Sequence, residues 1–156
     1  AYKFFQETKE TWIDDNFFSI KGFTDFEDDR EYNIIGEDTD DFFVANGMDG
    51  ELKLDKNIYP LNYWNISMLD KKEVFDTQKG IVRKINVEKL NNEKIEVNGE
   101  NLETEKYIFN ATKHPKDKGP FPEYTLWYHN KELIKMEFKN PKDKKIIKII
   151  RNDLGE

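Results

Sequence analysis

The chain has 156 residues, enough for one domain, and its 32 Asp and Glu against 25 Lys and Arg give a net charge of −7 at pH 7. This acidic balance argues against a nucleic-acid partner, because proteins that bind nucleic acids cluster basic side chains against the phosphates. No apolar run approaches the ~20 residues that cross a bilayer, and the lack of cysteine excludes disulfides, thiolate zinc sites and cysteine nucleophiles.

Short runs of alternating apolar residues, separated by turn residues roughly every 8–12 positions, predict antiparallel strands along the whole chain. In the first half, strands are expected at 2–12, 17–24, 31–36, 42–45 and 51–54. In the second half, they are expected at 81–90, 94–97, 103–111, 124–129, 133–139 and 145–151. The last of these is apolar on both faces, so we expect it at the centre of the sheet or covered on its second side.

One segment departs from this β pattern between the two halves of the chain. Pro60 suits a helix start, and Trp64, Met68 and Leu69 follow it at nearly helical spacing. We therefore expect a short helix or helical turn over 62–69, lying across the apolar face of the sheet. Residues 113–122, which contain three prolines among charged residues, are expected to form a mobile loop.

Together these patterns predict an all-β fold. We expect one antiparallel sheet of about ten strands, whose curvature leaves a concave apolar face for the short helix to cover. Residues 1–156 are expected to form a single β domain. A sheet with one solvated face needs few aliphatic residues, which fits a hydrophobic content of 37%, and the 14% aromatic residues would supply much of the core.

The sequence gives little support to common catalytic or metal chemistry. His114 and His129 fit no metal-binding spacing, and we interpret them as exposed turn residues. The acidic clusters at 25–29 and 37–41 lack the central glycine and final glutamate of an EF-hand, so charged hairpin tips explain them better than calcium does. Neither of the two serines lies in a G-x-S-x-G motif. We expect no catalytic residue, metal or cofactor, although 32 acidic residues always offer carboxylate pairs to an enzyme.

Three local groups are candidates for a binding site: 63–65, 76–80 and 126–128. A structural role can explain each group. Packing of large rings in the core explains 63–65 and 126–128. A turn explains 76–80, because Asp76 can accept backbone N–H groups and Gly80 permits positive φ. Alternatively, the aromatic residues form the wall of a small-molecule cavity, and amide side chains anchor a head group. The candidate ligand-binding residues are Trp64, Asn65, Gln78, Trp127 and Tyr128.

The order of these three groups resembles a family of uncharacterised bacterial envelope proteins, domain of unknown function family 6134. Leu69 lies between the first two groups, and Leu133 and Phe138 follow the third. Upstream, 2–4, Glu10-x-Trp12 and Thr24 fit an earlier strand pair, so the resemblance covers nearly the whole chain.

This resemblance implies an exported or periplasmic protein with one strongly curved antiparallel sheet, an open or half β-barrel. That sheet is similar to the half-barrels of the lipoprotein carriers LolA and LolB, which hold lipid on a concave face. It brings no catalytic residues. It also implies a signal peptide and additional strands before Tyr2, so we expect that the N-terminus of this chain is trimmed or incomplete.

We therefore expect a non-catalytic envelope protein that binds an apolar or amphipathic, lipid-like molecule in the concave face of its sheet. The alternative is an interaction or scaffold protein with a self-filled cavity and an exposed sheet edge that accepts a partner's strand. A third hypothesis is an enzyme that acts on a small envelope molecule.

Overall fold

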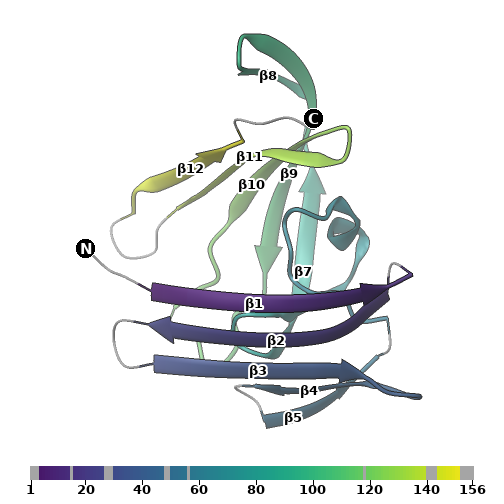
Figure 1. The fold of residues 1–156 in the computed structure, drawn as a ribbon. Helices are drawn as coiled ribbons and strands as arrows, with labels where there is room; N and C mark the ends of the chain where they lie inside the picture. Colours follow the sequence, from purple (N-terminus) through teal and green to yellow (C-terminus); the bar gives the residue numbers. More distant parts are fainter. Residues whose placement is uncertain are drawn as a thin grey trace. The chain divides into compact units, whose positions relative to one another are not determined.

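The structure is a computed structural model that describes residues 4–14, 16–26, 30–47, 50–55, 57–117, 119–139 and 144–151 (Figure 1). This part of the chain contains twelve strands and one short 3-10 helix. The strands pair in antiparallel fashion, so the predicted all-β antiparallel class is confirmed. The chain divides into two compact units, the first of residues 1–61 and 73–82 and the second of residues 62–72 and 83–156.

The first unit contains a five-stranded meander in which each strand pairs with the next one along the chain (Figure 1). Its strands are β1 (Phe4–Ile13), β2 (Asn16–Phe26), β3 (Arg30–Asp38), β4 (Phe43–Gly47) and β5 (Gly50–Leu54). Alternate side chains from these strands form a core around Phe17 and Phe43, whose rings stack with centroids 4.8 Å apart. Phe75 from β6 (Glu73–Asp76) belongs to the same core.

The turn after β6 has the chemistry that the sequence predicts. Asp76 Oδ1 accepts the backbone N–H groups of Gln78 and Lys79, at 2.9 and 3.3 Å, and the Asp76 carbonyl accepts the Gly80 N–H at 2.8 Å. Gly80 has a φ of 72°, a conformation that glycine adopts without steric cost. A Cβ at Gly80 would also lie 2.7 Å from the Cα of Gly47, so this turn packs backbone against backbone.

The second unit is organised around one long strand, β9. Its strands are β7 (Ile81–Lys89, of which the first two residues belong to the first unit), β8 (Glu93–Val97), β9 (Glu100–Ala111), β10 (Tyr124–His129), β11 (Glu132–Lys139) and β12 (Ile146–Ile150). They belong to the seven-stranded sheet, whose strand order is β12-β11-β10-β9-β7-β6; β6 is a strand of the first unit, and β8 pairs with β9 outside this path. β8 pairs with residues 100–104 of β9 and β7 with residues 107–111, so the two lie in succession beside the same strand.

Both faces of β10 are covered within the second unit. On one face, Trp127 packs in a cluster with Ile95 and Val97 of β8 and with Ile134 of β11. On the other face, the Tyr63 ring lies against the rings of Phe109 and Tyr124, with centroids 5.4 and 4.6 Å apart. The segment that carries Tyr63 continues into the 3-10 helix η1 (Ile66–Asp70), which stands in place of the short helix expected over 62–69.

Two expectations about the sheet are wrong. The described residues form two sheets, of five and seven strands, instead of one curved sheet, and neither sheet is closed into a barrel. The alternating pattern of a hairpin is the same whether its strands extend one sheet or start another, so it could not reveal this division. β12 is also not central: it is last in the strand order, and Ile146, Ile149 and Ile150 are 62%, 44% and 47% exposed.

Candidate ligand-binding cavity

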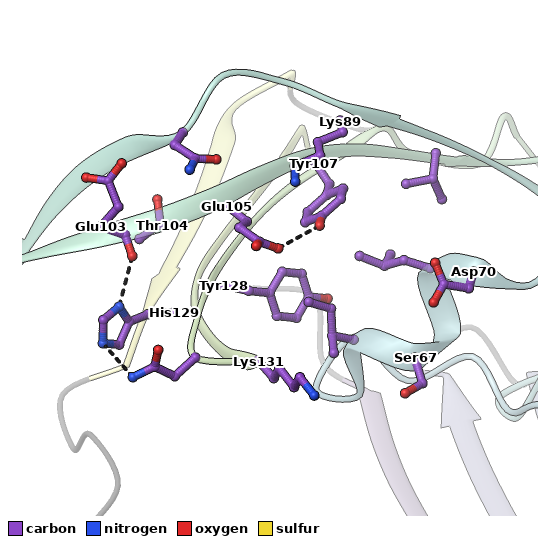
Figure 2. A pocket seen from close by; sticks show the side chains of 15 residues that line it. Ser67, Asp70, Lys89, Glu103, Thr104, Glu105, Tyr107, Tyr128, His129 and Lys131 are labelled. Atoms are coloured by element: carbon purple, nitrogen blue, oxygen red, sulfur yellow. Dashed lines mark hydrogen bonds between the residues drawn. The ribbon is translucent and has the colours of Figure 1, made fainter.

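The second unit contains a cavity of about 830 Å³, lined by residues of η1, β7, β9 and β10 and of the turn after β10 (Figure 2). Pockets of about 300–1,000 Å³ are typical of small-molecule sites. The lining combines an apolar wall with a set of charged side chains, and each part comes from more than one element.

The apolar wall is built around two tyrosines. Tyr107 of β9 and Tyr128 of β10 face one another with ring centroids 5.9 Å apart and an interplanar angle of 75°, an edge-to-face arrangement (Figure 2). Leu69 of η1 and Val87 of β7 extend this wall. The Tyr128 hydroxyl donates a hydrogen bond of 2.6 Å to the backbone carbonyl of Tyr63, which fixes the segment before η1 against β10.

The ionisation of both tyrosines is suppressed. Burial raises the pKa of Tyr128, with a smaller contribution from Tyr107. The Tyr107 hydroxyl donates to Glu105 Oε2 at 2.8 Å. Burial, this hydrogen bond and the negative charges of Glu105 and Asp70 raise the pKa of Tyr107 to about 12. Both phenols are therefore neutral hydrogen-bond donors at physiological pH.

One end of the cavity is formed by the turn that follows β10. His129 Nδ1 lies 2.9 Å from the backbone carbonyl of Glu103, and because a carbonyl only accepts, Nδ1 carries the proton. Nε2 then accepts from the Asn130 amide at 3.3 Å. His129 is half-buried at the end of β10 and lines the cavity, so it is not simply an exposed turn histidine. Figure 2 shows it beside Glu103.

Of the five candidate residues from the sequence, Tyr128 lines this cavity. Asn65 caps η1, since its Oδ1 accepts the Ser67 N–H at 3.1 Å, and so it positions a lining element without lining the cavity. Trp64, the residue before it, is 59% exposed. Gln78 lies in the turn after β6, in the first unit.

Trp127 packs on the face of β10 opposite to Tyr128, because neighbouring strand residues point to opposite sides. It is 3% exposed, and its indole N–H donates to Glu93 Oε2 at 3.0 Å. The ammonium groups of Lys106 and Lys135 lie 5.2 and 4.5 Å from its ring centroid. The hydrogen bond from Trp127, followed by that from Lys106, lowers the pKa of Glu93. Of the two roles that the sequence left open for Trp127, core packing or the wall of a cavity, the structure shows core packing.

The sequence did not single out the charged residues of the lining. These are Asp70, Lys89, Glu103, Glu105 and Lys131. Strand alternation places Glu105 and Tyr107 on one face of β9, which was readable from the sequence. The sequence could not predict that η1 brings Asp70 to this face of β9, because the position of η1 depends on tertiary packing.

Two further observations concern only the described residues. They contain no group of three or more His, Cys, Asp or Glu side chains that could hold a metal ion. None of their helices has the length and apolar character needed to cross a membrane.

Comparison with family models matches residues 1–151 to DUF6134, whose description is a domain of unknown function. This match confirms the family resemblance identified from the sequence. No curated protein matches the chain, and no solved structure does.

Proposed function

We propose that this chain, which belongs to the DUF6134 family, is a binding protein that holds a small amphipathic molecule in the cavity of its second unit. The observation that carries this proposal is the composition of the lining. Tyrosine rings and aliphatic side chains form one part of the wall, and charged side chains from η1, β7 and β9 form another. A cavity of about 830 Å³ that is divided in this way suits a molecule with an apolar body and a polar head group.

The proposal extends to the place where the protein acts. We propose that it works in the periplasm or envelope as a non-catalytic carrier or sensor of a lipid-like molecule, as the family resemblance implies. Cell fractionation of the source organism, followed by detection of the chain with an antibody, measures this directly. Recovery in the cytoplasmic fraction alone would contradict the location and leave the binding proposal standing.

Filling the cavity tests the binding proposal. Val87 lines the cavity, whereas its neighbour Glu88 is exposed and points to the other face of β7. We expect Val87→Trp to weaken binding of a lysophospholipid or medium-chain fatty acid by about tenfold or more, and Glu88→Trp to change it by less than about twofold. Isothermal titration calorimetry measures both, with circular dichroism as the check on folding. A wild-type chain that binds none of these molecules contradicts the proposal.

A second candidate function is supported by β12. This strand ends the described strand order and exposes Ile146, Ile149 and Ile150, so it offers apolar side chains at a sheet edge where a partner's strand could pair. Native mass spectrometry of the protein purified from its own cells separates the two candidates. A small molecule that stays bound to the chain favours ligand binding in the cavity. A protein that binds the wild-type chain in a fixed stoichiometry, but does not bind an Ile149→Lys variant, favours pairing at the β12 edge.

A further inference from the structure

We infer that the head group of the ligand is an organic cation, an ammonium group, which binds between the carboxylates of Glu105 and Asp70 against the ring of Tyr107. This inference rests on the proposed function and names the class of molecule that the cavity takes.

The carboxylates are the first argument. Glu105 comes from β9 and Asp70 from η1, and Figure 2 shows them in the same cavity with Tyr107 and Tyr128. The Tyr107 hydroxyl donates to Glu105 Oε2, which leaves Oε1 to accept a hydrogen bond from an ammonium group. Carboxylate hydrogen bonds to an ammonium group are charge-assisted, and both carboxylates are exposed, so a ligand can reach them.

The position of Tyr107 is the second argument. Its hydroxyl donates to Glu105 at 2.8 Å, and Asp70 lines the same cavity; after burial, the hydrogen bond and the negative charges of Glu105 and Asp70 contribute to the raised pKa of Tyr107. An ammonium group near an aromatic face is also attracted by the ring quadrupole. The ring already has one such neighbour, since Lys89 Nζ lies 5.9 Å from its centroid.

The balance of charge is the third argument. The lining contains three carboxylates, those of Asp70, Glu103 and Glu105, and two ammonium groups, those of Lys89 and Lys131. The whole chain has a net charge of −7, which raises the local concentration of cations and speeds their association at low salt. The two lysines are the groups through which an anionic ligand would bind instead, so the test must compare both charges.

The experiment uses three amphiphiles with the same ten-carbon chain: decylammonium, decyl sulfate and decyl maltoside, each below its micelle concentration. Binding is measured by isothermal titration calorimetry at low salt. We expect decylammonium to bind about tenfold or more tighter than decyl sulfate. Glu105→Gln and Asp70→Asn should each weaken decylammonium binding by about three- to tenfold and leave decyl maltoside within about twofold.

Glu105→Gln keeps an acceptor for the Tyr107 hydroxyl, so it removes charge with little change in shape. Glu88→Gln, on the outer face of β7, is the matched control that removes one carboxylate outside the cavity, and it should leave decylammonium binding within about twofold. Equal or tighter binding of decyl sulfate overturns the inference. If decyl maltoside then still binds, the proposed function survives; if none of the three binds, both fail.

Discussion

Tyr107 shows how a single residue can report the electrostatics of the cavity. Its pKa is raised from 10.0 to about 12, so in the folded chain it keeps its proton over a range in which the unfolded chain loses it. The stabilisation that this difference represents is fully present below about pH 10 and is lost as the pH rises through about 12.

We therefore expect the stability of the wild-type chain to fall more steeply between pH 10 and 12 than that of a Tyr107→Phe variant. Urea unfolding at a series of pH values measures this difference, and absorbance at 295 nm, roughly the tyrosinate maximum, follows the titration itself. Parallel pH profiles for the two proteins would show that Tyr107 has its ordinary pKa. Phe keeps the ring that packs against Tyr128, so folding should survive the substitution.

The two tryptophans that the sequence treated alike differ in their surroundings. Trp127 is 3% exposed and packs with Ile95, Val97 and Ile134, whereas Trp64 is 59% exposed. We expect Trp127→Ala to lower the free energy of unfolding by about 3–5 kcal/mol, and Trp64→Ala to lower it by less than about 1 kcal/mol. Chemical denaturation followed by circular dichroism measures both. Equal costs would contradict the packing described for β10.

At the scale of elements, a buried ion pair holds the loop between β9 and β10. Arg83 of β7 donates two hydrogen bonds to the Asp117 carboxylate, at 2.7 and 2.9 Å, and a third of 3.0 Å to the Thr112 carbonyl. Asp117 also accepts the His114 N–H at 2.8 Å. The described residues of 113–122 lie outside helices and strands, as predicted, and this ion pair anchors them to β7.

Replacing either Arg83 or Asp117 alone should lower the free energy of unfolding far more than replacing both. We expect Asp117→Leu or Arg83→Met alone to destabilise the chain by about 3 kcal/mol, because each leaves a buried charged group without its ion-pair partner. The double variant Arg83→Met/Asp117→Leu should recover much of that loss, since two apolar side chains can fill the space of a buried pair. Urea denaturation of the four proteins gives the coupling energy. Strictly additive losses would mean that the pair has no special role.

At the scale of the whole molecule, net charge and exposed apolar surface act together. The isoelectric point is near 5.0, so the repulsion that keeps copies apart vanishes there. β12 is then one sheet edge at which copies can associate, because Ile146 and Ile149 are exposed.

We expect a maximum of turbidity near pH 5 in the wild-type chain and a much smaller one in an Ile146→Asn/Ile149→Asn variant. Asparagine leaves the net charge unchanged, so the comparison isolates apolar surface. Light scattering measures the turbidity of both proteins from about pH 4 to about pH 7, a range that includes the isoelectric point. An identical profile in both proteins would place the associating surface elsewhere.

Comparison of particular strands shows what the sequence could predict and what it could not. The expected strand at 124–129 coincides with β10, because apolar alternation and the flanking turn residues define it locally. β12 has a sequence that suits a central strand, yet it lies at an edge with exposed isoleucines. Position within a sheet depends on which strands pair at long range, and one strand's own residues do not encode that.

The sequence by itself determined the antiparallel β class, most of the strands, the turn at 76–80 and the family, because each depends on local alternation, turn chemistry or the order of motifs. Only the tertiary structure decided that there are two sheets, and that Tyr128 faces a cavity while Trp127 is enclosed by β8. The physical reason is that both faces of β10 carry large apolar side chains. Which face is covered by a strand and which meets η1 is set by elements far away in the sequence.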